Sequence, residues 1–463
     1  MLVPDHCIKC MKNWIRQLIK GNKVRTNILQ VLPFWIAALV TGVIAVLYTK
    51  LFEWAEKLGV SLYKAHESLI FIMAPAGFVL AWLLVKQVDI YASGSGIPQV
   101  MAAIELTTPR EDDQVKRLLN VRMMLVKIAS SLLMIFGGAA IGREGPTIQI
   151  AGTVFRKINE WLPESWPKIS RKNMILTGAA AGLAAAFNTP LGGIVFAVEE
   201  LAKTHFSHFK TVIFTSVIIA GLTAQAFLGP YLYLGYPVIT QSAAYMLLAV
   251  IPVALIAGLG GSLMGIAILK VLNWKAKLKS RYTEMMFVLS CALIMGVLAY
   301  FFNNAILGSG KAEMSRLLFT GAKRVGWQVP AVRIAGPLLS FTTGASGGIF
   351  APSLGAGATL GAYIAGLFNL SPSNTNLLIL AGMVAFLTGV TRSPFTSAIL
   401  VLEMTDRHNV IFFLMLSAIA ASLVSSLISK HSLYEYLKLQ YILKLRKEQV
   451  GHVPMPMKNT GNE

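Results

Sequence analysis

One carboxylate stands in a stretch of small and apolar residues near the end of the first third of the chain. Glu144 lies within Gly142-Arg-Glu-Gly-Pro146, and the runs 134–141 and 147–154 on either side carry no charge. An ionisable group in such surroundings is a candidate functional group. The motif directly precedes the expected start of a helix, whose backbone N–H groups form a natural anion site. We therefore expect Glu144 to compete with an anion for this place.

Neutral donors that suit a passing anion occur elsewhere in the chain. A Lys or Arg in such a site would hold the ion too long, whereas backbone N–H groups at converging helix starts and one or two hydroxyls would release it. The sequence offers Ser95, the amides around Glu144 and Phe350, and the hydroxyl of Tyr434.

The composition is that of a polytopic helical membrane protein. Of 463 residues, 55% are hydrophobic and only 13% are charged, unlike an ordinary soluble domain. The 41 Lys and Arg residues exceed the 21 Asp and Glu residues, for a net charge of +20. In a membrane protein this excess is typical of cytoplasmic loops and tails and does not indicate nucleic-acid binding.

The elements that must position these groups follow from the uncharged runs. We expect membrane spans at 31–48, 69–85, 285–302 and 410–429, and at least two long helices between 211 and 269. A Gly- and Pro-rich turn at Ser93-Gly-Ser-Gly-Ile-Pro98 precedes a polar loop at 105–120 and a helix from about 121. Residues 334–391 are uncharged but rich in Gly and Pro. Irregular backbone of this kind survives in a membrane only where it lines a cavity or is buried in protein.

Basic residues near both ends predict two cytoplasmic tails and therefore an even number of crossings. The expected division is a tail at 1–27, a first membrane half at 28–232, a second half at 243–440 and a tail at 441–463.

An internal repeat supports this division into two halves. Gly178, Pro190 and Glu199 match residues 382, 394 and 403 at a common offset of 204, and residues 146 and 352 match at 206. Gly94-Ser-Gly96 has a fainter echo in Gly308-Ser-Gly310. Two related halves are the economical interpretation, although the pattern alone leaves a parallel or an inverted relation open.

No metal or cofactor site is expected. Cys7 and Cys10 have metal-site spacing but only His6 nearby, and Cys291 lies in an apolar helix. The seven histidines show no metal-ligand spacing.

Three motifs give the chain a family resemblance. Gly94-Ser-Gly-Ile-Pro98, Gly142-Arg-Glu-Gly-Pro146 and Gly348-Ile-Phe-Ala-Pro352, in this order, resemble the signatures of the CLC chloride channel/transporter family. Leu402-Glu-Met-Thr-Asp406 and Tyr434 match as well, so the resemblance covers nearly the whole membrane region.

The resemblance implies an all-α fold of two inverted-repeat halves, whose broken and tilted helices meet at a central anion site. It implies a homodimer with one pore per subunit. Ser95 and Tyr434 would coordinate a central chloride, together with amides near Ile349 and Phe350. Serine at 95 resembles chloride-selective members rather than fluoride exporters.

The resemblance also assigns proton chemistry. Glu144 matches the external gating glutamate, and Glu200 matches the internal proton acceptor found in exchangers. Lys127 matches a basic position of the family. These matches imply a chloride/proton antiporter, with chloride and protons as transported ions. The short tail suggests a prokaryotic protein, which places the chain in a bacterial inner membrane.

Each assignment has a simpler alternative. Glu144 could be a structural acid paired with Arg143, and Glu200 a solvated helix end like Glu199. Ser95 could serve only as a helix cap, and Tyr434 as an interfacial aromatic residue. Lys127 has a structural role as an equal alternative to an electrostatic one. Arg143 and Arg392 are expected to anchor loops.

Two other functions stay open. A passive chloride channel gated by Glu144 would leave Glu200 incidental. An intramembrane enzyme using Glu144 as a general acid or base would need a second catalytic group at depth. The uncharged stretches contain no such group, so we expect no enzyme.

Overall fold

The computed structural model describes residues 22–106, 108, 111–201, 210–229, 232–240 and 245–450. Within these ranges nine helices are long and apolar enough to cross a membrane. The expected spans at 31–48, 69–85, 285–302 and 410–429 coincide with four of them, and two more, at 210–228 and 246–275, cover the run 211–269. The chain is therefore all-helical over its described part, as its composition predicts.

Among the described residues, the first half contains nine α-helices and the second contains eight, followed by a terminal helix. In the first half they are α2 (Asn22–Ala65), α3 (Ile70–Val88), α4 (Ile97–Glu105), α5 (Asp112–Leu118), α6 (Val121–Phe136), α7 (Glu144–Glu160), α8 (Arg171–Phe187), α9 (Pro190–Phe196) and α10 (Lys210–Leu228). In the second they are α11 (Met246–Lys275), α12 (Arg281–Phe301), α13 (Lys311–Phe319), α14 (Gln328–Thr342), α15 (Phe350–Leu367), α16 (Pro372–Thr391), α17 (Pro394–Thr405) and α18 (Ile411–Ile428), before α19 (Leu433–Val450).

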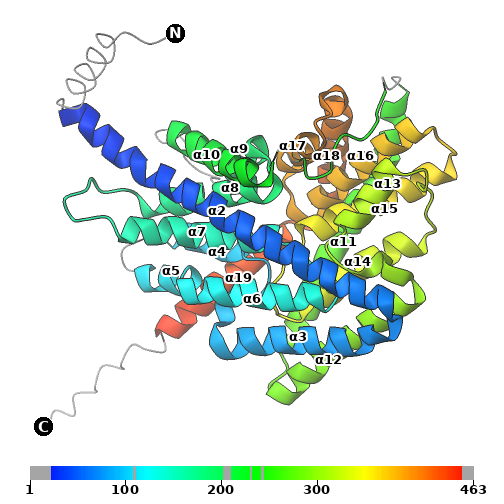
Figure 1. Ribbon diagram of the computed structural model, residues 1–463, viewed down its shortest axis with the longest axis horizontal. Helices are drawn as coiled ribbons and strands as arrows, with labels where there is room; N and C mark the ends of the chain where they lie inside the picture. Colours follow the sequence, from blue (N-terminus) through cyan, green and yellow to red (C-terminus); the bar gives the residue numbers. More distant parts are fainter. Residues whose placement is uncertain are drawn as a thin grey trace, which may run out of the picture.

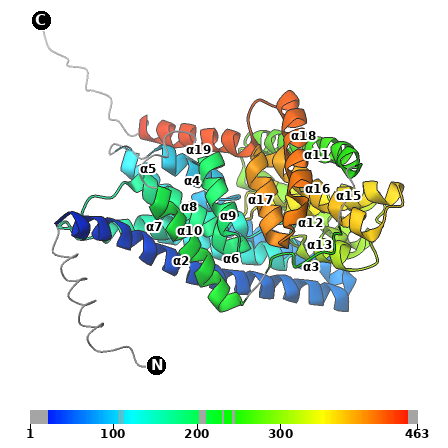
Figure 2. The same cartoon turned by 90° about the horizontal axis from the view of Figure 1, so that it is seen from above.

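The order of elements repeats along the chain. Apart from α5, each helix from α2 to α10 has a counterpart between α11 and α18. Three counterpart pairs pack against each other, namely α3 with α12, α7 with α15 and α9 with α17. An element touches its own counterpart when the halves are related by a local two-fold axis. The two halves lie side by side in Figure 1, and Figure 2 shows α2 along one face of the molecule and α19 along the opposite face.

Small residues allow the central helices to approach closely. α8 packs on α7 and α16 packs on α15, and 94% of the spanning window of α16 is buried. A methyl group on Gly357 would lie 2.3 Å from the carbonyl oxygen of Gly382. Only glycine fits at such a contact, so the Gly- and Pro-rich uncharged run forms the interior of the protein.

One sequence expectation needs correction. The polar stretch 105–120 is not wholly a loop, because α5 buries Val115 and Leu118 within it. The boundary expected at residue 441 stays a prediction; α19 continues through it, with Ile442 and Leu445 buried. Residues 1–21 of the expected N-terminal tail, including Cys7 and Cys10, lie outside the described residues. The same holds for the C-terminal tail beyond residue 450.

Candidate functional site

The starts of α7 and α15 meet at the centre of the molecule. Gly142, two residues before α7, and Gly348, two residues before α15, pair as an antiparallel bridge. The Gly142 N–H donates to the Gly348 carbonyl at 2.7 Å, and the Gly348 N–H donates back at 2.8 Å. The two glycines hold equivalent places in the repeat, so their pairing brings two equivalent helix starts to one point. Their positive dipole ends therefore converge there.

Glu144 lies between these two helix starts. Its side chain is 1% exposed, and it is the first residue of α7. The carboxylate folds back over Gly142, where an added methyl group would lie 2.2 Å from Oε2 and 3.2 Å from the Ala351 side chain. It faces the backbone N–H groups of Glu144 and Ala351. The carboxylate thus lies at the backbone N–H groups of two helix starts, the kind of place that suits an anion.

Arg143 acts electrostatically on the Glu144 carboxylate, but its ion pair is with Glu53 of α2. Arg143 is the N-cap of α7, and its Nη1 donates to Glu53 Oε1 at 3.0 Å. Arg143 therefore anchors the segment before α7 to α2. Arg392 likewise donates to the carbonyls of Ser425 and Ser429, which confirms that it anchors a loop.

Ser95 lies in a tight turn pressed against the start of α7. Gly94 and Gly96 flank it with φ values of +62° and +101°, a backbone that glycine adopts without strain. A methyl group on Gly145 would lie 2.2 Å from Ser95 Oγ. The N-cap of α4 is Gly96, not Ser95, so the interpretation of Ser95 as a simple helix cap is wrong. Its hydroxyl is buried and has no partner among the residues of its own turn or of α7.

Tyr434 brings a second hydroxyl to the same place from α19. It is fully buried, which excludes an interfacial position. Its ring stacks on Phe350 at 6.0 Å and 12°, and its hydroxyl lies beside the Ser95 side chain with no other hydrogen-bond partner. Buried hydroxyls normally make their full set of hydrogen bonds. Two buried hydroxyls that meet no polar group except each other indicate a site for a ligand that accepts hydrogen bonds.

The amides near Ile349 and Phe350 complete the group. Ile349 is the N-cap of α15 and Phe350 its first residue, and both are buried. Phe350 also contacts Phe196 edge-on at 6.3 Å. Apolar rings around the start of α15 exclude water and strengthen the dipole there.

Lys127 supports the turn that carries Ser95. The side chain is fully buried in α6, and Nζ donates to the Gly94 carbonyl at 3.0 Å and to the Ser93 carbonyl at 3.5 Å. Lys127 is thus a positioning residue whose charge lies next to the turn. Both the structural and the electrostatic interpretation fit this geometry.

Glu200 lies on the π-helical turn Ala197–Leu201 and is 5% exposed. The interpretation as a solvated helix end is therefore wrong. Ser393 Oγ donates to Glu200 Oε2 at 2.7 Å. Glu200 and Glu144 both act electrostatically on Tyr434, so the tyrosine lies within range of both carboxylates.

Glu199 has a role that the sequence analysis missed. Its carboxylate accepts the N–H groups of Phe395 at 3.1 Å and Thr396 at 2.6 Å, at the start of α17. Glu403 accepts the N–H groups of Leu191 at 3.1 Å and Gly192 at 2.8 Å, at the start of α9. Each glutamate caps the counterpart of its own helix, so Glu199 is not a solvated helix end. The common offset of 204 was the signal that pointed to this pairing.

No cluster of three or more His, Cys, Asp or Glu side chains suited to a metal occurs among the described residues.

The structure gathers Ser95, Glu144, Ile349, Phe350 and Tyr434 at one place. Lys127 lies directly behind the turn, and Glu200 lies apart from these residues at the end of α9.

Known proteins resemble this chain over most of its length. A family model described as "Voltage gated chloride channel" matches residues 76–426. The H(+)/Cl(-) exchange transporter ClcA of Citrobacter koseri is 27% identical over 461 residues, covering 94% of this chain and 93% of that protein. The ClcA of Salmonella arizonae is 26% identical with the same coverage.

Solved structures share the fold. A slow cyanobacterial Cl-/H+ antiporter matches with a TM-score of 0.77 at 24% identity, covering 91% of this chain and 99% of that one. A CLC-type fluoride/proton antiporter matches with a TM-score of 0.72 at 19% identity, covering 88% of this chain and 97% of that one. These likenesses confirm the expected fold class, an all-helical membrane protein built from two related halves.

Proposed function

The chain belongs to the voltage gated chloride channel family, and we propose that this multi-pass membrane protein exchanges chloride for protons. Relatives that match it along nearly its whole length are named H(+)/Cl(-) exchange transporters. The observation that carries the proposal is the Glu144 carboxylate between two converging helix starts, near two buried hydroxyls, Ser95 and Tyr434, that have no partner except each other.

The ionised Glu144 carboxylate fills the space where α7 and α15 begin, so chloride cannot occupy it. A proton taken up by Glu144 removes its negative charge and its competition for the backbone N–H groups. Chloride then takes the place of the carboxylate. The hydroxyl groups of Ser95 and Tyr434 donate hydrogen bonds to a chloride ion that lies deeper in the site. Because one group must be either ionised or protonated, chloride and proton movements become linked.

The proton needs a path to Glu144 from the opposite side. Glu200 is a buried carboxylate within electrostatic range of Tyr434, and the Ser393 hydroxyl orients it. We assign Glu200 as the internal proton acceptor and Glu144 as the external one. A passive channel gated by Glu144 is the second candidate, because the same anion site would serve it. In that case Glu200 would carry no proton.

An intramembrane enzyme has less support. The relatives are transporters, and chemistry at Glu144 would need a second catalytic group in reach. No cofactor is required, because both transported ions bind to the protein's own groups. The assembly we propose is a homodimer with one pore per subunit in a bacterial inner membrane, with both termini in the cytoplasm.

Proton movement driven by chloride tests the proposal. Purified protein in liposomes loaded with high chloride is diluted into low chloride, and external pH is recorded while a potassium ionophore sets the voltage. Exchange predicts that chloride efflux drives protons inward against their gradient and that the external solution becomes alkaline. Chloride efflux with no proton movement would leave the channel reading in place and refute the exchanger.

A further inference from the structure

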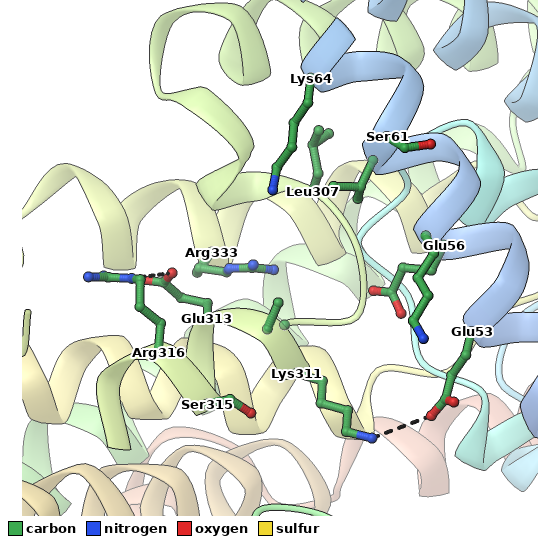
Figure 3. A pocket seen from close by; sticks show the side chains of 14 residues that line it. Glu53, Glu56, Ser61, Lys64, Leu307, Lys311, Glu313, Ser315, Arg316 and Arg333 are labelled. Carbon is green, nitrogen blue, oxygen red and sulfur yellow. Dashed lines mark hydrogen bonds and ion pairs between the residues drawn. The ribbon is translucent and has the colours of Figure 1, made fainter. Parts of the chain in front are cut away.

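A pocket of about 660 Å³ opens between α2 and α13 and lies outside the site described above. Figure 3 shows charged side chains on its walls, including Glu56 and Lys64 from α2 and Arg333 from α14. Lys57 of α2 also lines the pocket. Gly310 and Lys311, at the start of α13, form its edge. The proposed exchange mechanism makes no use of this pocket.

The turn at the pocket's edge repeats the turn that carries Ser95. Gly308-Ser309-Gly310 precedes α13 as Gly94-Ser95-Gly96 precedes α4, its counterpart. The φ values agree, at +72° and +92° for the two glycines here against +62° and +101° in the first half. Ser309 is 5% exposed. The faint sequence echo is therefore a true repeat of backbone geometry.

A buried cation lies behind each turn. Arg333 follows Lys127 at an offset of 206 residues, which is the offset of the helix-start motifs. Lys127 Nζ donates to the Gly94 carbonyl at 3.0 Å, and Arg333 Nη1 donates to the Gly308 carbonyl at 3.3 Å. Arg333 lines the pocket and is 3% exposed, and its buried Nε makes no hydrogen bond. A buried charged group is normally hydrogen-bonded at each of its N–H groups, so the Arg333 guanidinium lacks a partner for Nε.

The two turns differ in what their serine binds. Ser95 Oγ meets no carboxylate and lies beside the Tyr434 hydroxyl. Glu56 Oε1 accepts from both the Ser309 N–H at 2.7 Å and the Ser309 Oγ–H at 2.9 Å. A carboxylate oxygen therefore occupies the position of an anion on the second turn, as the Glu144 carboxylate does between α7 and α15.

The charges around the pocket favour an anion. Glu53 pairs with Arg143 and Lys311, and Glu313 pairs with Arg316. Among the described residues no carboxylate lies within ion-pair distance of Lys57, Lys64 or Arg333, although all three line the pocket. Once its internal pairs are formed, the pocket presents three cations and one carboxylate, that of Glu56.

We propose that the Ser309 turn is a second anion site, the repeat-related twin of the Ser95 site, and that Glu56 holds it until a halide displaces the carboxylate. The halide takes the N–H and Oγ–H of Ser309, and Arg333 supplies the positive charge. A full charge next to the site favours holding the ion over passing it on. The site therefore retains chloride beside the ion pair of Arg143, the residue next to Glu144. The choice of chloride as the natural ligand rests on the proposed function.

Bromide, located in crystals by its anomalous scattering, tests the site directly. Glu56→Ala vacates the serine donors, whereas Glu56→Gln leaves a neutral acceptor on them and serves as the matched control. We expect an additional bromide on Ser309 in Glu56→Ala at a concentration where Glu56→Gln shows none there. The double variant Glu56→Ala/Ser309→Ala should lose it. Halide titration calorimetry should count one more site per subunit in Glu56→Ala than in Glu56→Gln.

The bromide at Ser95 provides an internal standard. Bromide at Ser95 but none at Ser309 in Glu56→Ala would overturn the proposal. If Glu56→Ala fails to fold, the wild-type protein in saturating bromide decides the question, since the ion must then replace the Glu56 carboxylate on Ser309. A carboxylate that stays in place under those conditions would refute the site. Bromide on both turns in a protein that moves no protons would refute the exchanger and leave this site standing.

Discussion

The ring of Tyr434 lies stacked on the ring of Phe350, with centroids 6.0 Å apart and planes 12° from parallel. This contact joins α19 to the start of α15, the counterpart of the helix that begins with Glu144. It also fixes where the Tyr434 hydroxyl points, beside Ser95. The position of one anion donor therefore depends on an apolar contact between two distant parts of the chain.

Tyr434→Phe should weaken chloride binding without disturbing the fold, because the stacked ring remains and only the hydroxyl is lost. Hydrogen bonds to a charged group contribute roughly 1.5–3 kcal/mol, so we expect binding about tenfold to a hundredfold weaker. Titration calorimetry with chloride measures the change. Tyr436→Phe is the control, since Tyr436 is 38% exposed. Equal affinities for wild type and Tyr434→Phe would exclude the hydroxyl from the site.

Glu144→Gln should abolish proton movement while chloride flux continues. The neutral amide mimics the protonated carboxyl group and cannot take up or release a proton. Parallel recordings of chloride efflux and external pH from liposomes give both quantities. Glu67→Gln, an exposed acid outside the site, should behave as wild type. Proton transport that survives in Glu144→Gln would contradict the role of Glu144.

Glu200→Gln should also lose proton transport and keep chloride flux, for a different reason. Its amide interrupts the path from the inner side, while Glu144 still occupies and leaves the anion site. Glu199→Gln is a sharp control one residue away, because Glu199 caps α17 and carries no proton in our mechanism. If the Glu199 variant loses coupling and the Glu200 variant keeps it, the assignment is reversed.

Much of the site could be predicted because its geometry demands particular residues. The turns around Ser95 need glycine at positive φ, and the carboxylate of Glu144 stands out where every neighbour is small or apolar. The membrane spans could be predicted from the uncharged runs because a helix that crosses the membrane needs a long apolar segment. These features are local, so the sequence shows them.

The rest depends on packing between distant segments. Nothing near Lys127 in the sequence indicates that Nζ reaches the Gly94 carbonyl, because this contact needs α6 to lie behind the turn. Ser393 approaches Glu200 only after α9 and α17 pack together. The same packing turns Glu199 from an apparent helix end into a cap for α17. The helix α5 could not be predicted from its polar stretch, because within α5 only Gln114, Val115 and Leu118 are buried.

The reciprocal caps make a prediction about stability. Glu199→Ala and Glu403→Ala each leave backbone N–H groups at a helix start without a partner, and loss of such a cap costs about 1–2 kcal/mol. We expect similar losses for the two variants because of the two-fold relation. Thermal unfolding in detergent, followed by tryptophan fluorescence, reports the change, with the exposed Glu164→Ala as control. A loss confined to one of the two variants would contradict the equivalence of the caps.

The reversal potential of the purified protein in a planar lipid bilayer tests the central claim most directly. With chloride equal on both sides and a pH gradient imposed, an exchanger must show a non-zero reversal potential that changes sign with the gradient. With a chloride gradient, the potential must fall short of the value for chloride alone. We predict both results, and their loss in Glu144→Gln. A reversal potential that follows chloride alone and ignores the pH gradient would show that the protein is a passive chloride channel.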